Sequence, residues 1–345
     1  MNYKRNVFLL ILLISFLILP WSCQIKPQST LLSNTHPELK ILNGLTLSIN
    51  GNLALGAAAS SGNGSAELPY IIKNKIINAS GAGTHGISIR NTNVYFVLRN
   101  CTVTNAYTPY IAVYLYNVTH ARLENINASN NHGVAIYING SALITLNGTI
   151  ANNNYYTGVA LWKSLSINLT DITVNSNSYG FELEYTNYTT INGIIANNNA
   201  QTGIYYMYSI NTTLTGATAS NNAYGIAFRS CNNSKIVGNT ADNNKYDGIR
   251  LILSDNNRVS GNYASGNAIG IFLASSNYNL VQGNTLYGNS ECITEDSEYI
   301  CVGNTFKNNN CGTSMLLILL IILIPLIGVA IGLFILYQRR HINIS

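Results

Sequence analysis

Two glutamates separated by one residue, Glu182 and Glu184, are the residues whose type and spacing could support acid–base chemistry. On a β-strand such a pair shares one face, with the Cα atoms about 6.6 Å apart. Glycoside hydrolysis uses paired carboxylates near this separation. The two glutamates are therefore the candidate catalytic residues. The alternative interpretation is a solvated pair on a surface strand, balanced by nearby arginines.

Aromatic and charged residues recur before and after this pair at near-regular intervals. Aromatic rings stack on the apolar faces of sugars, while carboxylate and guanidinium groups bind hydroxyls. If the intervals place these side chains on one face, that face is suited to a polysaccharide or a surface glycan. The candidate ligand-binding residues are Tyr114, Tyr137, Trp162, Glu182, Glu184, Tyr205, Arg229 and Arg250.

The elements that must position these residues are sequence repeats. Gly225, Gly248 and Gly270 are 23 and 22 residues apart, and each is followed by an apolar, a variable and a second apolar residue. This alternation with a period of two predicts a strand with one buried face. Upstream, the same repeat position is assigned to Gly86, Tyr110, Gly133, Gly158, Gly180 and Gly203, and Cys292 closes the series.

Side chains two and four positions after each repeat position are predicted to point outward from the strand, in a +2 column and a +4 column. A third inward apolar column lies eleven positions after the repeat position, from Leu169 to Val281. The +2 column then contains Glu182, Tyr205 and Arg250, and the +4 column contains Tyr114, Tyr137, Trp162, Glu184 and Arg229.

A single repeat of this length cannot bury its own apolar face, whereas stacked repeats fuse their apolar columns into one core. The sequence therefore predicts an all-β, right-handed parallel β-helix of about ten coils with three parallel sheets. Gly-Asn and Asn-Asn fall at the predicted turns, where repeated Asn side chains are expected to form a ladder along the axis. An α-solenoid is excluded because no stripe with a 3.6-residue period is present.

The segments PYIIKNKIINASG and GISIRNTNVYFVLRNCTV, followed by coils of the form GIxLxxSxxNxIxGNxxxxN, resemble the NosD-type β-helix repeat family over roughly residues 68–311. Proteins of similar layout are membrane-anchored archaeal surface proteins. The family's association with copper is not expected to transfer. The chain has three Met and five scattered His, so we predict no metal site and no cofactor.

Composition limits the class of partner. Charged residues make up only 9% of the chain and the formal net charge is +5, with Lys and Arg scattered rather than clustered, so no nucleic-acid partner is expected. The sequence does not indicate an oligomeric state. Asn-x-Ser/Thr sequons are candidate glycosylation sites. They include Asn63, Asn117, Asn127, Asn139, Asn147, Asn168, Asn187, Asn211 and Asn232.

The two ends of the chain predict export and anchoring. Residues 1–23 have the layout of a signal peptide, and residues 24–67 are expected to form a linker and an N-terminal cap, with a small-residue loop near residues 53–67. The repeat domain spans residues 68–311. Residues 315–337 are apolar and uncharged, which predicts one transmembrane helix with a cytoplasmic tail at 338–345. The disulfide candidates Cys292, Cys301 and Cys311 lie in the last coil.

These features predict a membrane-anchored extracellular β-helix protein that binds surface glycans or polysaccharide, or that serves as an adhesive or structural rod. The alternative is a carbohydrate-active enzyme, a glycosidase or polysaccharide lyase, acting on the same face. The Gly-His-Gly and Asp-cluster patterns of β-helix polygalacturonases are absent, and so are the calcium-binding aspartates of pectate lyases. This absence favours binding over catalysis.

Overall fold

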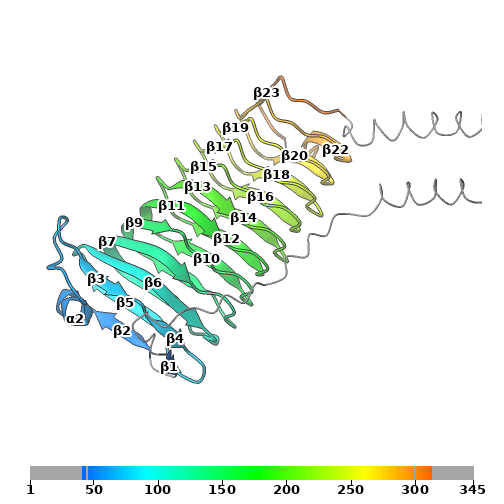
Figure 1. Cartoon of the computed structure of the whole chain (residues 1–345). Helices are drawn as coiled ribbons and strands as arrows, with labels where there is room; N and C mark the ends of the chain where they lie inside the picture. Colours follow the sequence, from blue (N-terminus) through cyan, green and yellow to red (C-terminus); the bar gives the residue numbers. More distant parts are fainter. Residues whose placement is uncertain (1–40, 44–45, 299, 313–345) are drawn as a thin grey trace, which may run out of the picture. The chain divides into compact units, whose positions relative to one another are not determined.

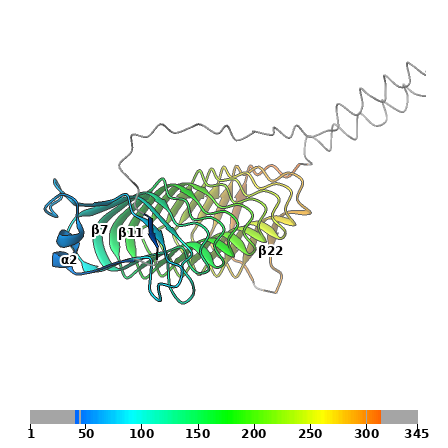
Figure 2. The same cartoon turned by 60° about the horizontal axis from the view of Figure 1, so that its bottom comes forward.

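The computed structural model of the protein describes residues 41–43, 46–298 and 300–312. The chain divides into two compact units, Met1–Glu38 and Leu39–Ser345, and every described residue belongs to the second. These residues form a right-handed parallel β-helix of about ten coils (Figure 1), which confirms the predicted fold class. Figure 2 shows the coils following one another along one axis, from helix α2 (Asn52–Ala58) to strand β22 (Glu291–Glu295).

The first sheet contains the strands that begin near the repeat glycines. Each strand pairs in parallel with its copy in the next coil, for example Val159 with Phe181 and Phe181 with Ile204. Its members are β2 (Leu47–Asn50), β5 (Ile87–Thr92), the start of β7 (Val113–Asn127), β8 (Ile136–Asn139), β10 (Thr157–Trp162), β12 (Tyr179–Glu184), β14 (Thr202–Met207), β16 (Tyr224–Arg229), β18 (Asp247–Ile252), β20 (Ile269–Ala274) and β22.

The second sheet carries the third apolar column, and Leu169, Ile191 and Leu214 pair in succession as the repeat predicts. The long strand β7 continues from the first sheet into this one. The other members are β1 (Ile41–Asn43), β3 (Tyr70–Lys73), β4 (Ile76–Asn78), β6 (Phe96–Thr104), β9 (Ala142–Asn147), β11 (Leu165–Thr173), β13 (Thr190–Ile195), β15 (Thr213–Thr215), β17 (Lys235–Val237), β19 (Arg258–Ser260), β21 (Leu280–Gln282) and β23 (Thr305–Lys307).

The third side of the stack differs from the three full sheets predicted. In the later coils it is a ladder of single parallel bridges, such as Thr218 with Thr240 and Thr240 with Tyr263, whereas in the first coils β1 and β4 pair on this side with the end of β6. The turns that flank this side leave room for one paired residue per coil, so it forms no separate strand in the later coils.

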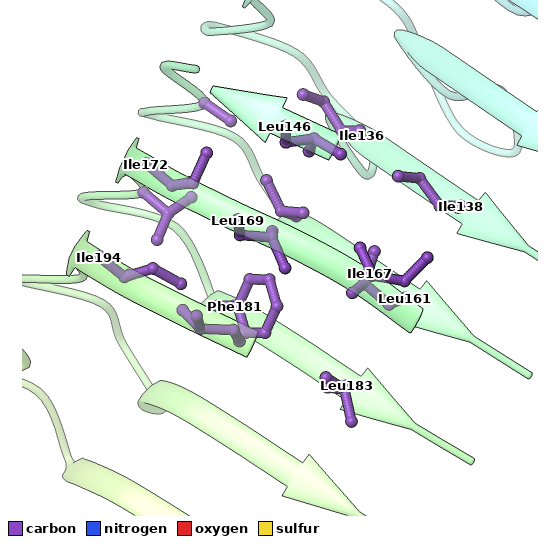
Figure 3. Packing of buried hydrophobic residues seen from close by; sticks show 14 of the residues in the cluster. Ile136, Ile138, Leu146, Leu161, Ile167, Leu169, Ile172, Phe181, Leu183 and Ile194 are labelled. Carbon is purple, nitrogen blue, oxygen red and sulfur yellow. The ribbon is translucent and has the colours of Figure 1, made fainter. Parts of the chain in front are cut away.

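The interior is a continuous apolar core. Figure 3 shows Ile136, Leu161, Phe181 and Leu183 from the first sheet facing side chains such as Leu169 from the second. Tyr206 and Phe228 stack inside the core at 4.3 Å between ring centroids. Because every coil adds its own apolar side chains to this column, the core lengthens with the stack rather than widening.

The register corrects two of the repeat positions. Ile136 pairs with Val113 on one side and Val159 on the other. Ala112 and Ala135, rather than Tyr110 and Gly133, therefore occupy the repeat position. Gly133 serves a different close approach, because a Cβ on it would lie 2.7 Å from the carbonyl oxygen of Tyr110.

From Gly158 to Gly270 the repeat glycines fit a close approach between coils, whereas the coils of Ala112 and Ala135 have a methyl group at this position. A Cβ added to Gly180 would lie 2.5 Å from the carbonyl oxygen of Gly203 and 2.8 Å from Nδ2 of Asn199. Gly225 and Gly248 have the same two kinds of neighbour, a carbonyl of the next coil and an Asn amide. Because glycine has no side chain, the backbones of two successive coils and one Asn side chain can pack closely at this turn.

That Asn belongs to a buried ladder along the axis. Asn199 Nδ2 donates to Asn222 Oδ1 at 3.1 Å, and Asn222 Nδ2 donates both to Asn244 Oδ1 and to the carbonyl of Ala196. Each Oδ1 also accepts the backbone N–H of the preceding ladder residue. The ladder runs through Asn131, Asn154, Asn177, Asn199, Asn222, Asn244, Asn267 and Asn289.

The N-terminal part of the stack differs from the expected linker and loop. Strand β2 pairs in parallel with β5, so the coils begin before residue 68. Residues 52–58 form helix α2 instead of a loop, and its Leu55 is buried in the core. The run of small residues allows this short helix to pack closely against the end of the first sheet.

The two ends of the chain lie partly outside the described residues. No helix within the described ranges is long and apolar enough to cross a membrane. The predicted signal peptide at 1–23 and the predicted transmembrane helix at 315–337 are not among those residues. In the last coil, Cys292 and Cys311 form a disulfide with a Cα–Cα distance of 5.5 Å, and Cys301 is half-buried.

Replacing a ladder residue tests the role of the buried amides. Asn222→Ala leaves the N–H and Nδ2 of Asn199 and the carbonyl of Ala196 without a partner in a buried corner. We expect the free energy of unfolding to fall by about 3 kcal/mol, measured by chemical denaturation. The matched control is Asn168→Ala on the exposed face of β11, expected to change it by less than about 0.5 kcal/mol. Equal losses in both variants would contradict the role assigned to the ladder.

Candidate functional site

The outer face of the first sheet contains a groove of about 630 Å³. It lies over strands β8, β10, β12 and β14, near the middle of the stack. Its lining includes five aromatic and two acidic residues. The side chains that define its floor and walls are Tyr110, Tyr137, Tyr156, Trp162, Glu182, Glu184, Tyr205 and Met207.

The corrected register explains the hollow. Tyr137, Ala160, Glu182 and Tyr205 are successive partners in one outward column. The small side chain of Ala160 therefore leaves space between a tyrosine ring and a carboxylate. Trp162, Glu184 and Met207 form the neighbouring column and pair in the same order. Side chains far apart in sequence are brought together because one coil separates each from the next.

One wall of the groove comes from turns rather than from strands. Thr108, Pro109 and Tyr110 belong to the turn before β7, and the peptide bond between Thr108 and Pro109 is cis. Tyr156, which is 46% exposed, extends the wall from the turn before β10. These residues were not predicted to line a site, because turn side chains do not follow the strand alternation on which the predicted columns depend.

Glu182 occupies the most enclosed acidic position in the groove. The Thr157 hydroxyl donates a hydrogen bond of 2.5 Å to Glu182 Oε2. Burial raises the pKa of the Glu182 carboxyl, the Thr157 hydrogen bond opposes this rise, and the nearby Glu184 carboxylate adds to it. Because a neighbouring negative charge and partial desolvation both favour the protonated form, this carboxyl keeps its proton to higher pH than an ordinary glutamate.

Two tyrosines of the groove, Tyr137 and Tyr205, are held as neutral phenols because their pKa values are raised. Burial, together with Tyr114, Glu184 and Glu182, raises the pKa of Tyr137 to about 12. Burial also raises the pKa of Tyr205, and a hydrogen bond from Arg229 opposes that rise. Neutral phenols can both donate and accept hydrogen bonds, which suits the recognition of sugar hydroxyls.

A second hollow of about 230 Å³ follows on the same face and is lined by Arg229, Arg250 and three tyrosines. The Arg250 guanidinium lies 4.7 Å from the Tyr224 ring centroid and 5.4 Å from that of Phe272. Its Nε is 3.6 Å from Asp247 Oδ2. Burial raises the pKa of Asp247 to about 6 even though Arg250 lowers it.

Tyr114 lies at the other end of the face, away from the glutamates. Its ring is 5.8 Å from the Tyr137 ring and 4.7 Å from His85, measured between centroids. His85 Nδ1 accepts the backbone N–H of Ile111, and burial, with the charge of Arg90, lowers the pKa of this histidine. The aromatic approach to the groove is therefore continuous from His85 to Tyr137.

The structure thus gathers most, but not all, of the predicted binding residues. Five of the eight line the groove, Arg229 and Arg250 line the second hollow, and Tyr114 stacks beside the groove. The predicted columns were partly wrong, because the register shift places Tyr114 and Tyr137 in the +2 column with Glu182, not in the +4 column with Trp162.

A further outward column, one position before the repeat glycine, was missed. Strict alternation places this position inward, but Thr157 contacts Glu182 and Asp247 contacts Arg250, both on the outer face. The backbone changes direction at the repeat glycine, so alternation does not continue through it. The column contains Thr157, Tyr179, Thr202, Tyr224 and Asp247.

The candidate glycosylation residues are all at least partly exposed. Asn63, Asn117, Asn168 and Asn211 are exposed, whereas Asn187 and Asn232 are half-buried and accept backbone N–H groups of the next coil through Oδ1. Modification of these last two would compete with a hydrogen bond that joins coils. The other three, Asn127, Asn139 and Asn147, lie at strand ends.

Comparison with solved structures identifies the class. A variant of the periplasmic alginate epimerase AlgG matches with a TM-score of 0.50 and 13% identity, covering 69% of this chain and 76% of the epimerase. PfbA, a surface adhesin of Streptococcus pneumoniae, matches with a TM-score of 0.50 and 12% identity, covering 80% and 81%. At such low identity these likenesses show the fold alone: the protein is a parallel β-helix.

The family follows from the sequence of the coils. A family model described as periplasmic copper-binding protein (NosD) matches residues 145–317, which is half of the chain. The chain therefore belongs to the NosD family. A comparison with curated proteins found no match.

The copper in the family's description was tested against the side chains. Among the described residues, no three or more His, Cys, Asp or Glu side chains come close enough to hold a metal ion. The ring nitrogen His85 Nδ1 already accepts a backbone hydrogen bond, and Met207 Sδ accepts the Tyr205 hydroxyl at 3.5 Å. The described residues do not fit a copper site.

The raised pKa of Asp247 predicts a pH dependence of stability. The folded pKa of about 6 lies above the ordinary 3.8, so the folded state binds this proton more tightly than the unfolded state does. The stability that this bound proton contributes to the folded state is therefore fully present at low pH, and it is lost as the pH rises through about 6.

As the pH rises from 4 to 7, loss of the proton from Asp247 should lower the free energy of unfolding by about 1–2 kcal/mol, after allowing for solvent screening. In the Asp247→Asn variant, the free energy of unfolding measured by denaturation should change less with pH over this range. Asp171→Asn, an exposed aspartate on β11, is the control and should keep the slope of the original protein. An unchanged slope in Asp247→Asn would contradict the assignment.

Proposed function

We propose that this protein binds a polysaccharide or surface glycan in the groove on the first sheet. The observation that carries the proposal is the meeting of Trp162, Tyr137 and Tyr205 around Glu182 and Glu184 in one open hollow. Aromatic faces supply apolar contact to sugar rings, and the acidic side chains accept hydrogen bonds from hydroxyls. The groove runs across successive coils, which suits an extended chain rather than a compact ligand.

The proteins of similar fold support a carbohydrate or adhesive role. One is named for its action on alginate, a polysaccharide, and another is named as a surface adhesin. A solenoid presents long flat faces, and repeat proteins generally use such extended surfaces for binding. The less specific alternative is an adhesive or structural rod without a defined sugar ligand. The groove favours glycan binding over this alternative.

The proposed setting is the cell surface. Residues 1–23 would act as a signal peptide, residues 24–67 would lead into and cap the coils, and residues 315–337 would anchor the chain with the tail 338–345 in the cytoplasm. The β-helix would then face outward, as in membrane-anchored archaeal surface proteins, with its sequons available for glycosylation. Protease treatment of intact cells should degrade the coils and spare the tail; a protected β-helix would contradict this topology.

Removing the indole tests the binding proposal. Trp162→Ala deletes the largest aromatic surface of the groove, so we expect affinity for a bound polysaccharide to fall about 10-fold or more. The assay is a screen of plant, bacterial and animal polysaccharides against the full chain, followed by titration of any that bind. Tyr263→Ala, an exposed tyrosine on the side of single bridges, should leave affinity unchanged. Equal affinities of both variants would rule out this groove.

Catalysis on the same face is the second candidate, and Glu182 is the observation in its favour. A carboxyl whose burial raises its pKa can serve as a general acid, with Glu184 as the partner carboxylate. If the protein cleaves a bound polysaccharide, Glu182→Gln and Glu184→Gln should each reduce turnover about 100-fold or more while binding persists. Turnover that survives both changes would exclude this pair.

A further inference from the structure

The face that carries the groove changes its charge along the stack. The first hollow is acidic, with Glu182 and Glu184, whereas the second contains Arg229 and Arg250. Tyr205 lines both hollows, so they adjoin across one side chain. A chain-like ligand lying along the axis would therefore meet carboxylates first and guanidinium groups two to three coils later.

The guanidinium group of Arg250 is oriented by its neighbours in a way that suits ligand binding. Its guanidinium is placed between the Tyr224 and Phe272 rings, and such stacking fixes a planar group at small entropic cost on binding. Asp247 sits 3.6 Å from Nε, and this buried Nε has no hydrogen-bond partner within the described residues. The guanidinium is thus oriented by its neighbours while its hydrogen-bonding capacity is not used up by them.

Arg229 adds a second cation at the rim. It is exposed, it projects from β16 beside Arg250's strand, and it hydrogen-bonds the Tyr205 hydroxyl. The ion pairs found in the described part of the chain join Arg122 to Glu124 and Arg250 to Asp247, so Arg229 has no carboxylate partner there. The two guanidinium groups are therefore accompanied by a single paired carboxylate, that of Asp247, and the hollow has an excess of positive charge.

We propose that the second hollow is a subsite for an anionic group, so that the ligand is an acidic saccharide. Its carboxylate or sulfate binds Arg229 and Arg250, and its neutral, hydroxyl-bearing units lie over Glu182 and Glu184. Planar guanidinium groups bind such oxyanions through paired N–H donors, which neutral sugars cannot exploit. This inference rests on the proposed function, since it names the class of glycan bound by the same face.

The test titrates the full chain with two matched pairs of probes. The first is a hexuronate oligomer and its carboxyl-reduced counterpart, and the second is a sulfated glucan oligomer and its desulfated counterpart. The inference predicts that at least one acidic probe binds about 10-fold more tightly than its neutral counterpart, and that added salt removes the difference. The pair that shows the preference identifies the anion as carboxylate or sulfate.

Three variants locate the effect. Arg250→Gln and Arg229→Gln should each lower affinity for the acidic probe to about that of its neutral counterpart. Lys235→Gln removes the same charge from the second sheet and should keep the preference. Arg229 is exposed, so its variant remains informative even if Arg250→Gln fails to fold.

The outcomes separate this inference from the proposed function. Equal binding of acidic and neutral probes, with loss in Trp162→Ala, would overturn the anionic subsite and leave glycan binding intact. A preference that persists in both arginine variants would also overturn it. Failure of every probe to bind would count against both.

Discussion

The close approach of successive coils at one corner is the constraint on which the rest of the structure depends. There a glycine, the carbonyl of the next coil and a buried Asn amide share a space that a single methyl group would fill. The Asn ladder satisfies backbone groups that a tight turn would otherwise leave buried without partners. Since each amide bonds to its counterpart in the next coil, the ladder also fixes the register of the coils from Asn131 to Asn289.

Register, in turn, determines the surface. Once the coils are aligned, Tyr137, Ala160, Glu182 and Tyr205 follow one another across four strands, and the small alanine opens a groove. The same alignment places two arginines after the acidic stretch. The surface chemistry of this protein is therefore determined by columns of outward side chains that cross the strands. The columns can vary while the buried corner stays constant, which is why one fold accommodates very different surface functions.

Much of the fold could be predicted from the sequence, because every coil needs the same residue types at the same buried positions. The apolar alternation, the glycines and the asparagines each mark a position that every coil needs, so the solenoid and its first face are visible without coordinates. The prediction failed at Tyr110 and Gly133, where the glycine was given more weight than the Asn ladder: Asn131 and Asn154 are one coil apart and give the correct alignment.

The remaining features have no repeating signal. The turn side chains Pro109, Tyr110 and Tyr156 build a wall of the groove, but each turn is unique to its coil. The column that begins at Thr157 depends on how the backbone bends at the glycine, which a period of two does not describe. Helix α2 forms at the end of the stack, where no neighbouring coil dictates the conformation.

The disulfide between Cys292 and Cys311 has a mechanical consequence. The final strand, β23, pairs on one side only and would be the first to peel away under tension applied from the C-terminal side. Cys311 follows that strand, and its covalent partner lies in β22. A pulling force reaching Cys311 is therefore transmitted to β22 through the sulfur atoms, so the last coil is loaded as a closed loop instead of being unzipped residue by residue.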